Sequence, residues 1–478
     1  MTISHYRAKV RLHAAFTIGV LSSILLLGVS VPGRAQQASL ARPADAPAPG
    51  NLPATAQEGG GHLSLREAVV LALKNNLSVR VAGTQVDETA GTSERKLSAL
   101  LPHASSESYA SLQNRNLRAF GFAFPGVPVP LTVGPFSNYD FRVFADQTLV
   151  DRQAYHTWQA SKRQQDASKL SYQDTRDLVI RQAAGDYLDA QAASAEVEAA
   201  KARVETSRAL EKLARDQHSA GLATGVDVLR AQVQLQRDQQ NLLVAQDSFQ
   251  TSLLVLQRFL GLRPGAPLVL SDKLEFRSIP PPEAGQAVQA ALEARADYRS
   301  LRAQREALME QEKASRARYL PKLSVNGNYG PFGRTFGELP GVGLIQGTLS
   351  FTIFDRDRSG EAKELQSRAQ RIDEQIGDLE RGIEQDVRKA LLDLVSAEQQ
   401  VSVTQAGVDL AESELKLAED RFRNGVTDNI EVITAQSSLE SAQDDHITAL
   451  ARHADARMAL ARALGATEQS YENYLGSK

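Results

Sequence analysis

One stretch of this 478-residue chain restricts the possible architectures more than any other part of it. Between Asp151 and Gly221 the chain contains no proline and a single glycine, Gly185. Because proline and glycine are the residues that most often end helices, this stretch predicts one continuous helix of about 65 residues. At about 1.5 Å per residue such a helix is roughly 100 Å long, which is too long for a compact globule.

A second long helix is predicted from Arg356 to Arg423, and it shows how such helices pack. Apolar residues recur there at every seventh position, namely Val387, Leu394, Val401, Val408, Leu415 and Phe422. A sustained seven-residue apolar repeat indicates that the helix packs lengthwise against other helices. Phe422 is interpreted as a packing residue of this line.

The two long helices belong to an internal duplication. Segments of the first half recur 204 residues later: 150–152 at 354–356, 218–221 at 422–425 and 226–228 at 430–432. The Leu-Pro pair at 101–102 recurs at 320–321, an offset of 219, so the first copy holds 15 extra residues. The extra piece includes the Phe-, Gly- and Pro-rich stretch 119–137, which we expect to be a loop facing the outside.

We therefore predict two structural repeats, 63–265 and 283–466, joined by a linker, 266–282, and followed by a tail, 467–478. Each repeat is predicted to contain a medium helix, two strands, a very long helix and another medium helix. In the first repeat the medium helices are expected over 64–101 and 226–260. Placed end to end, they match the length of the long helix. We therefore expect the two medium helices (the half-rods) to pack, one after the other, along the length of the long helix.

Residues 1–35 have the features of an export signal. Arg7, Lys9 and Arg11 precede the mostly apolar, uncharged stretch 14–31, and Gly33-Arg34-Ala35 offers a small-residue cleavage site. A retained membrane anchor is the alternative, since about 18 uncharged residues is borderline for a spanning helix. Residues 36–62 are rich in proline, alanine and glycine and are predicted to be a flexible leader.

Composition narrows the possible chemistry. The chain has no cysteine, which excludes disulfide scaffolds, thiolate zinc sites, thiol nucleophiles and a lipid-modified N-terminal cysteine. A net charge of −3 gives no reason to expect a nucleic-acid partner. Known nucleotide-binding, metalloprotease and hydrolase motifs are absent from the sequence, so we predict no catalytic residues, no cofactor and no metal site. His446 and His453 lie seven residues apart and are interpreted as surface residues.

The strand segments have a membrane-type pattern. Apolar and small polar residues alternate through 323–329 and 344–353, and more weakly through 139–143. The same period occurs in half-buried strands of soluble sandwiches. However, 104–155 and 319–354 hold 15 of the 27 aromatic residues, and aromatic girdles of this kind are typical of outer-membrane barrels. Four strands cannot close a barrel, so three chains with twelve strands are predicted.

Three motifs within this duplicated plan point to a family. They are Leu63–Asn76, Arg295–Ala303 and Tyr319–Ser324, and they occur in family order. The chain resembles the TolC-type outer-membrane efflux channels, also called outer membrane factors, over about 63–466. The resemblance implies an α+β membrane protein: a homotrimer with a 12-stranded β-barrel, four strands per chain, continued by a long periplasmic α-helical barrel.

The resemblance also implies a function. Channels of this kind are passive exit ducts of tripartite efflux or type I secretion systems, fed by an inner-membrane pump through a periplasmic adaptor (membrane fusion protein). The protein is therefore expected in the outer-membrane lipid, exported and not lipidated. The rival reading is a soluble periplasmic coiled-coil adaptor or structural spacer, which suits the heptads but not the lipid-type strands. Neither cargo nor pump class follows from the sequence.

Two turns are the expected functional sites. Gly221, Leu222 and Thr224 follow the first long helix, and Gly425, Val426 and Thr427 follow the second. A reversal of the chain at both points puts them at the far, periplasmic end of the helices. By resemblance, these tips are where the adaptor docks and where the channel is constricted.

Three carboxylates beside the tips are candidates for the constriction: Asp227, Asp428 and Glu431. Repeated by threefold symmetry, they would ring a pore and favour cations. The alternative is local: Gly221 and Gly425 end helices, while Asp227 and Asp428 stabilise the N-termini of the next ones. Thr434 stands where the family's best-known member has a second acidic pore residue.

Overall fold

The computed structural model describes residues 61–117, 119 and 132–468, all of them within the unit 56–478. The expected signal peptide, most of the leader, most of loop 119–137 and the tail from 469 lie outside the described residues. Among the described helices, none is both long and apolar enough to cross a membrane.

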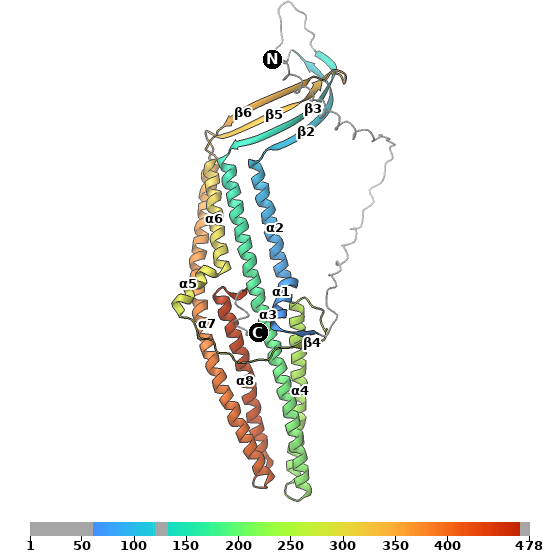
Figure 1. Ribbon diagram of the computed structural model, residues 1–478, viewed down its shortest axis with the longest axis vertical. Helices are drawn as coiled ribbons and strands as arrows, with labels where there is room; N and C mark the ends of the chain where they lie inside the picture. The colour runs from blue at the N-terminus through green and yellow to red at the C-terminus, as the bar shows by residue number, and fades with distance from the viewer. Residues whose placement is uncertain (1–60, 118, 120–131, 469–478) are drawn as a thin grey trace, which may run out of the picture. The chain divides into compact units, whose positions relative to one another are not determined.

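The chain passes twice through the same order of elements (Figure 1). The first pass contains α1 (Leu65–Asn75), α2 (Leu77–Leu97), β2 (His103–Asn116), β3 (Thr132–Val150), α3 (Arg152–Ser219) and α4 (Gly225–Phe259). The second contains α5 (Ala284–Ala294), α6 (Ala296–Ala317), β5 (Lys322–Gly333), β6 (Gly341–Ser350), α7 (Asp357–Arg423) and α8 (Asn429–Ala463). Three short elements lie outside this repeat: the 3₁₀ turn η1 (Ser98–Leu100) and the strands β1 (Gly61–Leu63) and β4 (Leu268–Leu270), which pair in parallel.

The two long helices are confirmed. α3 has 68 residues and α7 has 67. Asp151 caps α3, where its carboxylate accepts from the Ala154 backbone N–H at 2.8 Å. Along α7 the heptad residues Val387, Leu394 and Phe422 are buried, as expected for a helix packed along its length.

The half-rods are also confirmed. α1, α2 and α4 pack along α3, and α5, α6 and α8 pack along α7. α1, α2 and α4 have 11, 21 and 35 residues, which together nearly match the length of α3. α3 and α6 pack against each other, so the two repeats form one continuous helical layer.

The expectation of one helix over 64–101 is wrong. α1 ends at Asn75, and the backbone of Asn76 is extended, with φ −63° and ψ 132°. The Asn76 side chain accepts from the Ser78 N–H at 2.9 Å and so caps α2, while the Asn75 amide donates to the Leu260 carbonyl at 3.1 Å. Asparagine competes with helical hydrogen bonding in this way, and here the break seats α1 against the end of α4.

The four long strands form one antiparallel sheet in the order β2-β3-β5-β6. The cross-strand register places Val143 opposite Tyr329, and Tyr329 opposite Gly343, so these residues share one face. Tyr329 and Ile345, on that face, are 70% and 84% exposed in the single chain. β2 and β6 each keep an edge that no described strand pairs with.

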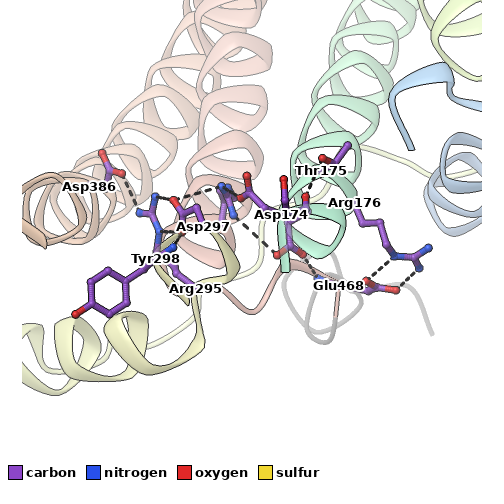
Figure 2. A network of polar contacts seen from close by, with 11 residues as sticks. Asp174, Thr175, Arg176, Arg295, Asp297, Tyr298, Asp386 and Glu468 are labelled. Atoms are coloured by element: carbon purple, nitrogen blue, oxygen red, sulfur yellow. Dashed lines mark hydrogen bonds and ion pairs between the residues drawn. The ribbon is translucent and has the colours of Figure 1, made fainter. Parts of the chain in front are cut away.

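An ionic network fastens the two repeats together midway along the helices (Figure 2). Arg295, which precedes α6, is buried and bonds to Asp297 at 2.7 Å and to Asp386 of α7 at 3.0 Å. Arg462 of α8 pairs with Asp174 of α3 and lies 4.0 Å from Asp297. Four helices are thus joined through two arginines.

Candidate functional site at the helical tips

Both predicted turns close a long helix in the same way. Gly221 has a φ of 75° and Gly425 a φ of 66°. The Leu222 N–H donates to the Gln217 carbonyl at 2.8 Å, and the Val426 N–H donates to the Arg421 carbonyl at 2.9 Å. This is the hydrogen-bond pattern of a Schellman motif, which uses a left-handed residue to end a helix.

The turns leave apolar side chains uncovered at the tips. Leu222 is 71% exposed and Val426 is 68% exposed in the single chain. Thr224 and Thr427 flank them, so each tip gathers its three predicted docking residues into one short turn. His218, beside the first tip, is exposed and its Nδ1 lies 3.0 Å from the Ala223 carbonyl oxygen.

Asp227 is held inside its own chain. It is only 6% exposed, and its carboxylate accepts from the Thr224 N–H at 2.9 Å and from the Thr224 hydroxyl at 2.7 Å. Burial acts to raise the pKa of Asp227, but the hydrogen bonds from Thr224 outweigh it and hold the pKa below its usual value. Its geometry is that of a capping box at the start of α4.

The two candidate carboxylates of the second repeat, Asp428 and Glu431, are more exposed than Asp227. Asp428 is exposed and caps α8, where it accepts from the Ile430 N–H at 3.2 Å. The side chain of Glu431 is 38% exposed and pairs with Arg421 at 2.8 Å. The two positions that align in the duplication, Asp227 and Glu431, therefore differ in their freedom to reach another chain.

Two amide side chains, which sequence reasoning missed, join one tip to the other. Asn429 is fully buried and donates to the backbone carbonyl of Asp227 at 2.6 Å. Gln217 donates to the carbonyl of Phe422 at 3.0 Å. The duplication could not reveal these contacts, because Asn429 aligns with Gly225 and Gln217 aligns with Arg421.

Phe422 lies in an apolar cluster shared by all four tip helices, as the heptad predicted. The cluster contains Leu210, Ala214, Ala231, Leu415, Ala418, Phe422, Val432 and Ala435. Above it, a buried polar group links α3, α4 and α8: the Ser207 hydroxyl donates to Asp238, and the Gln436 amide donates to Ser207 at 2.6 Å. The tips are therefore fastened by both apolar and polar contacts.

The histidine interpretation was wrong for one of the two residues. His453 is 1% exposed and packs against Phe276, with ring centroids 4.9 Å apart, whereas His446 is partly exposed. In the part of the chain that the structure describes, no three His, Asp or Glu side chains gather as a metal site would require.

Comparison with known proteins identifies the family. The family model described as "Outer membrane efflux protein" matches residues 68–262 and 287–466. The chain belongs to this family. The two matched segments fall on the two passes through the same elements.

Among curated relatives, the pyoverdine export outer membrane protein OpmQ of Pseudomonas putida is 26% identical over 311 residues, which cover 63% of this chain and 65% of the relative. The toluene efflux pump outer membrane protein TtgC of Pseudomonas putida is 25% identical over 395 residues, 80% of this chain and 78% of the relative. Both are named for efflux or export through the outer membrane.

Solved structures give the same fold. The outer-membrane channel OprN has a TM-score of 0.70 and 18% identity, and covers 84% of this chain and 90% of its own. The Campylobacter jejuni CmeC outer membrane channel has a TM-score of 0.72 and 16% identity, and covers 86% and 89%.

The protein is therefore the outer-membrane channel of an efflux system, with a periplasmic helical extension. Channels of this family are homotrimers: four strands from each chain form a 12-stranded barrel, continued by a helical barrel. They work with a periplasmic adaptor and an inner-membrane pump, and the family is one of channels rather than enzymes. The rival reading as a soluble adaptor or spacer is excluded.

Proposed function

We propose that this channel is a passive exit duct. Its two helical tips form its periplasmic end, bind the adaptor and constrict the pore. The observation that carries the proposal is the pair of glycine-ended turns that hold Leu222 and Val426 out in solvent. In this proposal the channel conducts passively, and the inner-membrane pump supplies the energy for transport.

The tips suit the docking of a periplasmic adaptor. Exposed apolar side chains that project from a rigid turn are the kind of anchor that protein interfaces bury. Gly221, Leu222 and Thr224 supply one contact, and Gly425, Val426 and Thr427 supply the other. Because the two turns are similar but not identical, an adaptor meets two related surfaces on each chain.

We assign the constriction of the pore to the carboxylates of the second tip. Glu431 and Asp428 are exposed enough to reach toward the pore axis, where three copies would form a ring that favours cations. The Asp227 carboxylate accepts from Thr224 and holds the start of α4 in place, while the backbone carbonyl of Asp227 accepts from Asn429 and so ties the tips together. Opening then requires the α7–α8 hairpin to move away from the α3–α4 hairpin.

The cargo is proposed to be small organic molecules. Two relatives of about 25% identity are named for pyoverdine export and toluene efflux, and a third for antibiotic efflux. These cargoes share a modest size and an organic skeleton.

We also propose that the chain arose by duplication of one unit, with repeats at 63–265 and 283–466, the linker at 266–282 and the tail at 467–478. The repeated order of helices and strands supports these limits.

Single-channel conductance in a planar bilayer tests the tip assignment. Detergent-purified trimers of the wild type, Glu431→Ala and Asp227→Ala are compared, with Glu374→Ala, an exposed carboxylate on α7 far from the tips, as the control. We expect small cation-preferring openings that grow in both tip variants, and weaker cation preference mainly in Glu431→Ala. Tip variants that conduct like Glu374→Ala would refute the constriction while leaving the channel intact.

A further inference from the structure

Arg457 of α8 is a buried cation that pairs with no acid in the described part of the chain. Its side chain is 3% exposed, and its Nε has no hydrogen-bond acceptor. Within the residues that the structure describes, no ion pair or hydrogen bond to its other nitrogens is found either. Buried arginines are almost always paired, because removing a charge from water without compensation costs several kcal/mol.

A second buried group lies one turn earlier on the same helix. His453 is 1% exposed, and its Nε2 also lacks a partner. Residues four apart on a helix lie on the same face, so the two unpartnered nitrogens belong to one region. Burial lowers the pKa of His453, and the nearby charge of Arg457 lowers it further, so this imidazole is neutral and can donate a hydrogen bond.

The linker between the repeats borders this region. Phe276 packs against the His453 ring in a tilted arrangement, with ring centroids 4.9 Å apart, and is still 44% exposed, while its neighbour Arg277 is exposed. Burial, together with the charge of Arg277, lowers the pKa of Arg457 to about 10. Glu398 of α7 is the acid whose charge acts on His453. The charge of Arg277 thus acts on Arg457, and in the described part of the chain neither arginine forms an ion pair.

We propose that Arg457, His453 and Arg277 bind an oxyanion at the linker. A guanidinium offers a planar fork of N–H donors that matches the two oxygens of a carboxylate, phosphate or sulfate. Phe276 and Arg277 are exposed, so the linker is the side of this region that faces solvent. The oxyanion has two possible sources, a carboxylate of the neighbouring chain in the trimer or a free inorganic anion.

Thermal dissociation of the detergent-solubilised full-length trimer tests the site, in sodium chloride and in sodium phosphate at equal ionic strength. The variants are Arg457→Met, which keeps the volume without charge, and Arg277→Gln, which changes only the exposed linker. Arg452→Gln is the control, because Arg452 is an exposed arginine on the same helix.

We expect Arg457→Met and Arg277→Gln to lower the melting temperature by at least about 2 °C while Arg452→Gln leaves it unchanged. If phosphate raises the wild-type melting temperature and both site variants lose that rise, the source is a free anion. If the variants are weakened and phosphate has no effect, the source is the neighbouring chain.

Two outcomes overturn the proposal. An Arg457→Met trimer as stable as the wild type, or more stable, would mean that the cation is truly unpaired, since an apolar replacement then removes a desolvation cost. Weakening in Arg457→Met alone, with Arg277→Gln unchanged and no response to phosphate, would mean that Arg457 only packs.

Discussion

At the scale of single residues, the tips need glycine for its backbone conformation and not for its small size. A Cβ added at Gly221 or Gly425 would meet no atom within 4 Å. Glycine is needed there only because φ is positive, a conformation that costs other residues about 1 kcal/mol or more.

Gly425→Ala should therefore destabilise the trimer by about 1 kcal/mol through backbone strain alone. Gly407→Ala is the matched control, since Gly407 lies within α7, has no positive φ and also has free space around its Cα. Alanine at that helical position should stabilise slightly. Melting temperatures of the two purified variants check this, and equal shifts in the same direction would contradict it.

Asp177 gives stability a dependence on pH. Burial raises its pKa from 3.8 to about 6, against the charge of Arg462. A raised folded-state pKa means that the native protein holds this proton more tightly, so the stabilisation is complete below pH 4 and is lost as pH rises to 6.

The melting temperature should consequently fall between pH 4 and 6.5, and fall less in Asp177→Asn. Asn can still accept the hydrogen bond that the Glu468 N–H donates to Asp177 at 3.1 Å. Some slope should remain, because burial also raises the pKa values of Asp238 and Glu440. Asp378→Asn, at an exposed pair, should keep the full wild-type slope.

At the scale of elements, two amide side chains tie the two helical hairpins of the tips to each other. Asn429 bonds α8 to the carbonyl of Asp227 in α4, and Gln217 bonds α3 to the end of α7. These are side-chain to backbone contacts between hairpins, each worth about 1 kcal/mol.

Asn429→Ala should release the α8 tip and increase the open probability in planar bilayers. Asn424→Ala is the matched control, because the amide of Asn424 donates only within its own turn, to Asp420 at 2.8 Å. A variant at Asn429 that opens no more often than the one at Asn424 would rule out the tie as a restraint on opening.

The spacing of apolar residues and the positions of proline and glycine were sufficient to predict α3, α4, α7 and the strands of the second repeat, because these features are local. They could not predict the break at Asn76, whose neighbour Asn75 bonds to a carbonyl 185 residues away. His453 and Asn429 were missed for the same reason: a polar residue on a helix is judged exposed unless its distant partner is known.

At the scale of the whole molecule, the sheet must present one face to lipid. The register puts Ile345 on the apolar face and Gln346 on the polar one. In a membrane barrel, lysine on the lipid face costs up to about 2–4 kcal/mol near the midplane, whereas the inner face tolerates charge.

Ile345→Lys should accordingly reduce the amount of trimer recovered from outer membranes, while Gln346→Lys should be recovered at wild-type levels with altered ion selectivity. Detergent extraction followed by electrophoresis without heating measures the trimer. Equal recovery of the two variants would contradict the assignment of the faces.

The edges of β2 and β6, with which no described strand pairs, have a consequence for how the protein is made in the cell. A lone chain has no way to satisfy those edges in lipid, so insertion and assembly must occur together. By mass action, the yield of trimers should then rise more steeply than in proportion to the supply of unassembled chains. Small changes in expression would produce large changes in the number of assembled channels. Aggregation through the strand edges would compete with assembly whenever chains accumulate faster than they form trimers.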